Sequence, residues 1–387
     1  MIKEANRLHD INEYYFSEKL QEIANLNSKG KDIINLGIGN PDMIPSAPTL
    51  EALTTSAQQV GNHGYQSYKG VLEFRNAIAD WSRDFFNIEV NPVSEVLPLL
   101  GSKEGIMHIS SAFVNPGDEV LVPNPGYPTY SSVSKLVGAK IRNYNLLPDN
   151  NWEINIEELK QQDLSKVKIM WVNYPHMPTG AKGSSQMFDE LIELAKENQF
   201  IICNDNPYSL ILNDNPRSIF TNKSAKSVAL ELNSMSKSHN MAGWRVGWVI
   251  GHEDYIKTIL KVKSNVDSGM FLPVQHAAIQ ALNNSHQWHE NQNLEYAVRR
   301  VKAWQLLDTL GANYSKDQAG LFIWAKVSDD VENVIQYVDN LIYKAGVFVA
   351  PGSIFGDMGE RYIRISLCST SETFDKAIDR IENNIIE

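Results

Sequence analysis

Residues 234–248 read SMSKSHNMAGWRVGW, and the fold and chemistry of the chain are best inferred from this stretch. Lys237 lies between serines, and Arg245 follows eight positions later. This combination suits an amine that forms a Schiff base beside a phosphate, because the amine must be partly desolvated and the phosphate needs several donors. We therefore interpret Lys237 as a nucleophile, with Ser234, Ser236 and Arg245 as phosphate ligands.

A solvated lysine in a serine-rich loop is the alternative, and it would suffice for an isolated Ser-Lys-Ser tripeptide. It does not explain Gly243, Arg245 and Gly247, whose spacing is typical of a tight turn into a buried strand. The stretch resembles the lysine motif of the class I/II aminotransferases, which are pyridoxal-phosphate (PLP) enzymes of fold type I. The resemblance covers nearly the whole chain. The segments GSKEGIMH and KSNVDSGMF are similar to diaminopimelate and aspartate aminotransferase-like members.

The composition of the chain excludes several classes of partner. A net charge of −11 over 387 residues argues against a nucleic-acid or acidic-membrane surface, which would need clustered positive charge. Cys203 and Cys368 lack metal-ligand spacing, which favours buried thiols in a reducing compartment over a metal site. Neither a signal-peptide pattern nor an apolar run of about 20 residues is present. We therefore expect a cytoplasmic enzyme without a metal.

Several candidate site residues follow apolar strands. Ser102, Tyr127, Asp205 and Lys237 each come after such a strand and are separated by helical stretches. This order predicts an α/β fold whose mainly parallel sheet presents one edge of loops to a ligand. The resemblance implies a seven-stranded sheet between helices and a smaller α+β domain. The expected division is an N-terminal arm and part of the small domain (1–45), a large PLP-binding domain (46–282) and a C-terminal small domain (283–387).

Three of the expected helices can be placed along the chain. One lies in the N-terminal arm, with Phe16, Leu20 and Ile23 on one face, one begins near Leu72, and a long one covers about 288–310.

A phosphate site is also expected where a helix follows the strand VLPLL. Ser102 and Lys103 lie in its first turn, where free backbone N–H groups and the helix dipole favour an anion. Ser102 is a candidate N-cap as well, a role compatible with phosphate binding. The spacing is not that of a Walker loop, and the absence of a dinucleotide fingerprint disfavours a nicotinamide enzyme.

Asp205 stands at the carboxyl end of the apolar run FIICND. A buried carboxylate is costly without a positive partner, and a pyridinium nitrogen would be one. The resemblance gives Asp205 this role, places the ring of Tyr127 against the cofactor ring, and makes Tyr208 a donor to the cofactor phenolate. The alternatives are a turn cap for Asp205 and plain packing for Tyr127 and Tyr130.

Substrate contacts come from three segments. By resemblance, Arg364 binds the substrate α-carboxylate, the backbone at Gly39 assists, and Tyr14 reaches the substrate from the arm. Arg361 is expected to be a surface charge. The residue matching Tyr65 crosses to the cofactor phosphate of the partner subunit, which implies a homodimer with shared active sites.

One position departs from the family pattern. The family sequence is normally Asn-Pro-Thr-Gly, and its asparagine donates to the cofactor phenolate, whereas Met177 stands at that place here. The loss of this hydrogen bond removes stabilisation of the charged phenolate, so it should raise the pKa of the Schiff base. His176 and Asn173 are the two candidates to replace it, and the sequence does not decide between them.

The implied function is transfer of an amino group from an L-amino acid to a 2-oxo acid, with 2-oxoglutarate a plausible acceptor, in two half-reactions. Lys237 would move the proton between the substrate Cα and the cofactor. The alternatives are a PLP-dependent carbon–sulfur lyase on the same fold and, with less support, a weakly active PLP-binding regulator. The donor stays open among diaminopimelate, aspartate, alanine, methionine and others.

Overall fold

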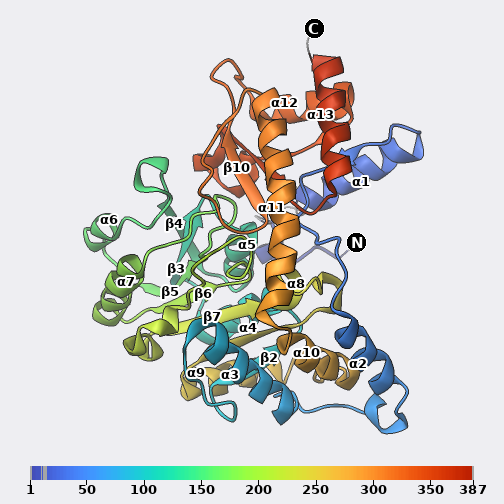
Figure 1. Ribbon diagram of the computed structural model, residues 1–387. Helices are drawn as coiled ribbons and strands as arrows, with labels where there is room; N and C mark the ends of the chain where they lie inside the picture. Colours follow the sequence, from blue (N-terminus) through green and yellow to red (C-terminus); the bar gives the residue numbers. More distant parts are fainter. Residues whose placement is uncertain (1, 10, 12–14, 386–387) are drawn as a thin grey trace.

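The computed structural model describes residues 2–9, 11 and 15–385. Its main feature is a seven-stranded sheet that lies between two layers of helices (Figure 1). The strands, in spatial order, are β2 (Val96–Leu99), β8 (Gly247–Gly251), β7 (Ala229–Ser234), β6 (Ile201–Asp205), β5 (Val167–Val172), β3 (Glu119–Asn124) and β4 (Lys140–Asn145). Strand β8 is antiparallel to both neighbours, and the other pairings are parallel.

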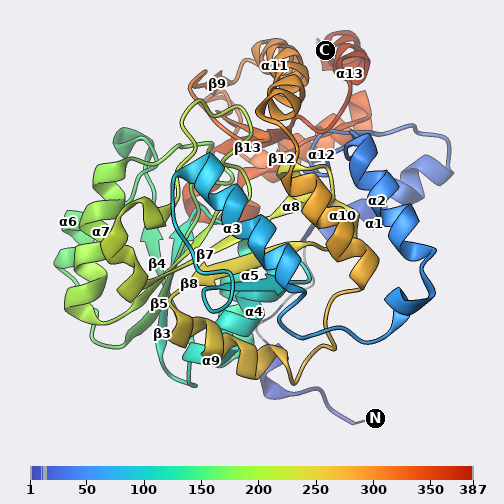
Figure 2. The same cartoon turned by 60° about the horizontal axis from the view of Figure 1, so that its bottom comes forward.

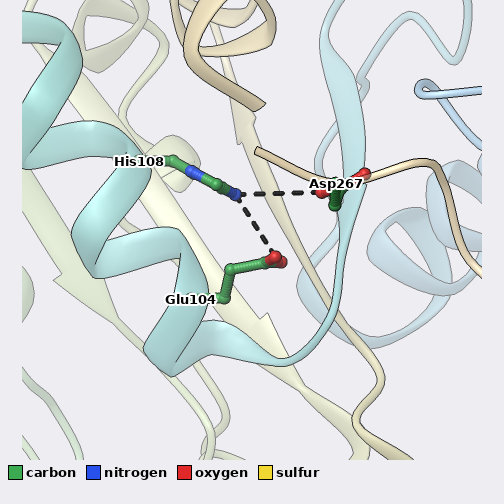
Figure 3. A group of neighbouring side chains, drawn as sticks. All are labelled: Glu104, His108 and Asp267. Carbon is green, nitrogen blue, oxygen red and sulfur yellow. Dashed lines mark ion pairs between the residues drawn. The ribbon is translucent and has the colours of Figure 1, made fainter. Parts of the chain in front are cut away.

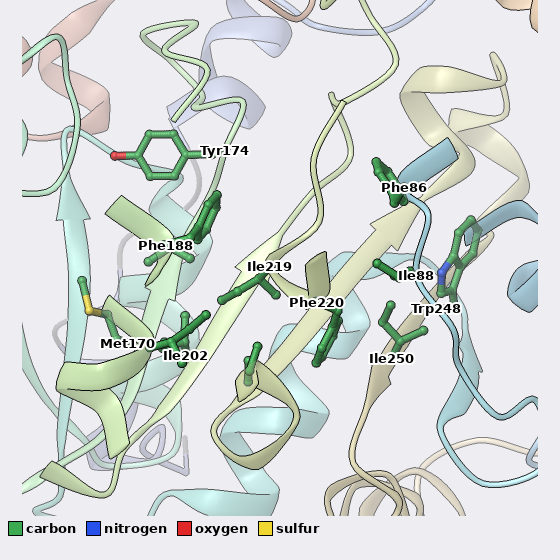
Figure 4. Close-up of a cluster of buried hydrophobic side chains, with 14 of the residues drawn as sticks. Phe86, Ile88, Met170, Tyr174, Phe188, Ile202, Ile219, Phe220, Trp248 and Ile250 are labelled. Carbon is green, nitrogen blue, oxygen red and sulfur yellow. The ribbon is translucent and has the colours of Figure 1, made fainter. Parts of the chain in front are cut away.

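The inner strands are apolar because both of their faces are covered. In β5, Met170 and Val172 belong to one buried cluster, while Ile169 and Trp171 point to the cluster on the opposite face. Figure 4 shows part of the first cluster, including Met170. This alternation has the period of two expected of a strand packed on both sides.

Helices cover the two faces in separate groups. Side chains of α3 (Leu72–Phe86), α7 (Ser185–Asn198) and α10 (Leu272–Leu282) fill the first cluster. Those of α4 (Ser102–Phe113), α5 (Pro128–Leu136) and α9 (Glu253–Lys263) fill the second. Helix α2 (Ala47–Ala57) packs on α10, which also contacts α3 (Figure 2). The short helices α6 (Ile156–Lys160) and α8 (Met235–Ser238) also belong to this part.

A second, smaller α+β region contains the C-terminal part of the chain. Its antiparallel sheet has the order β12 (Ala350–Pro351), β13 (Tyr362–Ser366), β10 (Phe322–Lys326) and β9 (Asn313–Tyr314). The N-terminal segment joins it, because β1 (Ile34–Asn35) pairs with β11 (Val347–Phe348). The helices here are α1 (Tyr15–Ser28), α11 (His286–Thr309), α12 (Val334–Asn340) and α13 (Ser371–Ile385). In Figure 1, α11 extends from the large sheet to this region.

Short helical turns lie between several of these elements. The 3₁₀ turns are Asn6–Leu8, Val60–His63, Pro148–Asn150, Ile219–Thr221, Lys223–Ser227, Ala242–Trp244, Gly352–Phe355 and Asp357–Gly359, and a π turn covers Leu341–Ala345.

The expected seven-stranded, mainly parallel sheet and the smaller α+β region are confirmed. The helix expected near Leu72 begins there, and the long helix expected over 288–310 is α11. Three details differ. Phe16 and Ile23 are buried as expected, but Leu20 is 41% exposed. The N-cap of α4 is Gly101, because Ser102 is already the first residue of the helix. Arg361 donates to the carbonyls of Ser328 and Val331 and so holds a loop, where a surface charge was expected.

In the described part of the chain, none of the helices combines the length and the apolar character that crossing a membrane requires.

Candidate active site

A cavity of about 670 Å³ lies where the carboxyl ends of β6 and β7 meet α4, α8 and the smaller region. Among the described residues, it brings together all the site residues expected from the sequence except Tyr65. The expected residues that line it are Gly39, Ser102, Lys103, Tyr127, Asp205, Tyr208, Ser234, Ser236, Lys237, Arg245 and Arg364.

Lys237 reaches the cavity from α8, directly after β7. The turn is fixed by Ser234, whose hydroxyl accepts from the Ser236 backbone N–H at 3.2 Å. The Lys237 Nζ donates to the carbonyl of Gly39 at 2.5 Å. Burial lowers the pKa of Lys237, and the charges of Arg364 and Arg245 lower it further. These causes favour the neutral, nucleophilic amine.

One end of the cavity is basic. Lys103 lies near Arg245, and its pKa is lowered first by burial and then by the charge of that arginine. The hydroxyls of Ser234 and Ser236 are 2.9 Å apart, and Ser102 is the first residue of α4. Two cations, hydroxyls and a helix N-terminus together suit a multiply charged anion such as phosphate.

Asp205 ends β6 with its carboxylate inside the protein. Its Oδ2 accepts from the hydroxyl of Tyr130 at 2.8 Å, while its Oδ1 has no hydrogen bond in the described part of the chain. Burial raises the pKa of Asp205 from 3.8 to about 6. The Oδ1 atom is therefore placed for a positively charged donor.

The sequence did not reveal the role of Tyr130. This side chain is buried and its ring stacks on Trp171, with centroids 5.1 Å apart and planes 2° apart. Its neighbour Tyr127 meets it edge to face at 5.5 Å and lines the cavity. The signal available in the sequence was the second tyrosine of the motif PGYPTY.

Arg364 enters from β13 and is buried among aromatic rings. Its guanidinium carbon is 3.9 Å from the ring centroid of Phe322 and 4.6 Å from that of Phe355. Its Nη2 donates to the carbonyl of Gly37 at 2.7 Å, and its Nη1 lies 3.2 Å from the sulfur of Met177. These contacts hold the planar group in one orientation.

The comparisons with known proteins agree with this site. The family model described as aminotransferase class I and II matches residues 31–381. The chain belongs to this family.

The named relatives are similar along the whole chain. The LL-diaminopimelate aminotransferase of Dehalococcoides mccartyi strain BAV1 is 38% identical over 382 residues, covering 98% of each chain. That of Aquifex aeolicus is 38% identical and covers 99% of each. Among solved structures, apo-BacF from Bacillus subtilis has a TM-score of 0.95 at 32% identity and covers 99% of this chain and 98% of its own.

A mutant of Thermus thermophilus aspartate aminotransferase has a TM-score of 0.92 at 25% identity, covering 99% of this chain and 100% of its own. The protein is thus a PLP-dependent aminotransferase of fold type I. The family and the named relatives give the carbon–sulfur lyase alternative no support.

The residues of the aminotransferase cavity fit this cofactor. The basic end suits its phosphate, and the Oδ1 of Asp205, buried without a hydrogen bond in the described residues, suits its protonated ring nitrogen. Gly101 brings the backbone close to this end, because it has φ +90° and a Cβ there would overlap the Nη2 of Arg245. A larger residue would therefore displace the guanidinium.

Of the two candidate replacements for the missing asparagine donor, Asn173 lines the cavity and His176 does not. The amide of Asn173 donates to the carbonyl of Asp205 at 2.5 Å and accepts from the N–H of Met177 at 2.8 Å. His176 does not line the cavity, and its Nδ1 is 2.8 Å from the Thr179 hydroxyl. Burial lowers the pKa of His176 to about 3. Met177 itself lines the cavity.

The two remaining predicted residues are Tyr65 and Tyr14. Tyr65 is 93% exposed. Tyr14 lies outside the described residues.

Proposed function

We propose that Lys237 both holds the cofactor and moves the proton that amino transfer requires. When bound, pyridoxal phosphate supplies a carbon for attachment and a ring that accepts the electrons released at the substrate Cα. The observation that carries the proposal is the place of Lys237 Nζ, inside the cavity and with its pKa lowered by burial. An amine at this position can accept a proton from the substrate and donate it again.

The remaining cofactor contacts follow from the cavity lining. At the basic end, the phosphate would be bound by Ser102, Lys103, Ser234, Ser236 and Arg245.

The ring contacts come from other residues of the lining. Asp205 would accept from the ring nitrogen through its Oδ1, Tyr208 would donate to the ring oxygen, and Tyr127 would lie against the ring face. A carboxylate paired with the ring nitrogen keeps that nitrogen protonated, so the ring withdraws electrons.

Arg364 would bind the substrate α-carboxylate, assisted by the backbone near Gly39 and by Tyr14. A guanidinium held between aromatic rings is preorganised for a carboxylate. We propose LL-diaminopimelate as the first donor to test, because the relatives carry that name at up to 38% identity over the full chain. The proposed acceptor is 2-oxoglutarate.

The proposed assembly is a cytoplasmic homodimer in which Tyr65 reaches the cofactor phosphate of the partner subunit. Tyr65 and Val60 are each 93% exposed, and Ile44 is 73% exposed. Large apolar side chains that are exposed in the single chain suit an interface.

The proposed division of the chain into domains is 1–45, 46–282 and 283–387, which places α11 at the start of the last domain.

The deciding experiment is an absorbance titration of the purified protein with pyridoxal phosphate, followed by a panel of amino acids. The expected result is a cofactor band that one amino acid converts to the pyridoxamine form and 2-oxoglutarate restores. Lys237→Ala should lose the band of the attached cofactor. A band unchanged in Lys237→Ala would contradict the assignment, and ammonia with pyruvate from a cysteine-type substrate would favour a lyase.

A further inference from the structure

A largely buried group of ionisable side chains joins two parts of the fold beside the active site. Glu104 and His108 lie one turn apart on α4, and Asp267 comes from the loop 264–271 (Figure 3). The Nε2 of His108 is 3.4 Å from Glu104 and 4.0 Å from Asp267. Lys263 contacts both oxygens of Asp267 at 2.8 Å. We call these four residues the α4 network.

The α4 network consists of groups that are costly to bury. His108 is 1% exposed and neither of its ring nitrogens has a hydrogen bond in the described part of the chain, while Lys263 is 2% exposed. Three side chains of this set could ligate a metal ion. The ammonium of Lys263 already neutralises Asp267, so the protein supplies its own cation here. Buried ion pairs contribute little net stability, so orientation is the better explanation of their presence.

One side of the network fixes the phosphate site. The Oε2 of Glu104 accepts from the backbone N–H of Leu100 at 2.6 Å. This bond holds the chain immediately before Gly101, Ser102 and Lys103, which form the start of α4. A change in the position of Glu104 therefore changes the turn that presents the helix N-terminus.

The other side reaches the segment that follows Tyr65. The Oδ1 of Asp267 accepts from the N–H of Gly269 at 2.8 Å. Gly269 packs so closely on this segment that a Cβ would lie 2.7 Å from the carbonyl of Gln66 and 2.9 Å from that of Ser67. Loop 264–271 therefore supports the backbone next to Tyr65.

Gln275 strengthens the same connection. Its side chain donates to the carbonyl of Met270 at 2.6 Å and accepts from the N–H of Val71 at 2.8 Å. Gln275 of α10 thus holds both Val71, at the end of the Tyr65 segment, and Met270 of loop 264–271.

We propose that the α4 network is a positioning device that couples the two active sites of the dimer. It holds the phosphate site of its own subunit and, through Asp267 and Gly269, the Tyr65 segment that serves the partner's cofactor. This inference rests on the proposed function, in which Tyr65 crosses to the partner. The physical path of the coupling consists of the hydrogen bonds of Glu104 and Asp267 to the backbone, the approach of the His108 ring to both carboxylates, and the close packing of Gly269.

Mixed dimers test the coupling. One subunit carries Lys237→Ala, so each dimer has a single lysine for the cofactor, in the unaltered subunit. Asp267→Asn or His108→Leu is then added to the Lys237→Ala subunit. The complete site keeps its own network and, in the proposed dimer, receives Tyr65 from the altered chain. Its dissociation constant for pyridoxal phosphate, measured from the band of the attached cofactor, should rise about fivefold or more.

Matched controls separate the possible outcomes. Ser110→Ala on the same subunit changes an equally buried residue of α4 outside the network and should have no effect. Tyr65→Phe there should weaken binding as well. An unchanged constant with Asp267→Asn and His108→Leu overturns the proposal, as does a stoichiometric metal whose removal produces the same loss. If even the mixed dimer without these added changes attached no cofactor, the proposed function would have failed instead.

Discussion

At the scale of single residues, Met177 has the clearest consequence. By the family resemblance it takes the place of an asparagine, and its sulfur lies 3.2 Å from the Nη1 of Arg364. Met177→Asn should lower the pKa of the lysine-bound cofactor by roughly one to two pH units, because it restores a hydrogen bond to a charged group. An absorbance titration measures this value. Met177→Leu, which offers no donor, is the control and should leave it unchanged.

Asp205 should make the free energy of unfolding depend on pH, and bound cofactor should reverse the direction of its effect. Burial raises its pKa from 3.8 to about 6, so the cofactor-free fold binds a proton more tightly than the unfolded chain does. Stability should therefore fall by up to about 3 kcal/mol as the pH rises from about 4 to 6. Asp205→Asn should remove this fall.

Urea unfolding at pH 4.5 and 7.5, with and without pyridoxal phosphate, measures the effect. At pH 7.5 without cofactor, Asp205→Asn should be more stable than the wild type. With cofactor, the wild type should be more stable than Asp205→Asn. The same order in both conditions would show that Asp205 does not face a positive group.

The residue types of the site could be predicted from the sequence, because the chemistry demands an amine, a carboxylate and phosphate donors at strand ends. The side chains that these residues contact could not be predicted from the sequence. Tyr130 and Asp205 are 75 positions apart, and Met177 and Arg364 are 187 apart. Such contacts depend on the packing of whole elements, which periodicity does not encode.

At the scale of elements, the start of α4 depends on Gly101. Gly101→Ala should displace Arg245 and weaken binding of the cofactor phosphate, besides imposing backbone strain of about 1–3 kcal/mol, because φ 90° with ψ 157° is a conformation that residues other than glycine rarely adopt. Gly117→Ala is a matched control, since Gly117 has φ +93° but nothing within 4 Å of the added Cβ. The comparison separates the displacement of Arg245 from the general effect of a side chain at positive φ. Equal cofactor affinity in the two would contradict the role of the α4 start.

At the scale of the whole molecule, the site should need two subunits. Tyr65→Phe should weaken cofactor binding while changing the free energy of unfolding by less than about 0.5 kcal/mol, because the side chain is 93% exposed. Tyr343→Phe removes a hydroxyl from another exposed tyrosine and should not affect the cofactor. Sedimentation of the wild type should give a dimer. A monomer with full cofactor affinity would exclude the shared site.

The overall architecture was predictable because alternating apolar strands and helices leave few arrangements other than a mainly parallel sheet. The α4 network was not predictable from the sequence. Glu104 and His108 have the spacing of an ordinary helix face, and Asp267 has no feature that distinguishes it from other loop residues. Only the approach of loop 264–271 to α4 brings them together.

The order of the strands also affects how the chain is made. Strand β2 is an edge strand whose neighbour β8 is synthesised about 150 residues later, since Leu99 pairs with Gly247. At about 5–20 residues per second, ribosomes need roughly 8–30 s to reach that partner. During this interval the nascent chain exposes an apolar edge, so its yield should depend on the speed of translation and on chaperones that cover such segments.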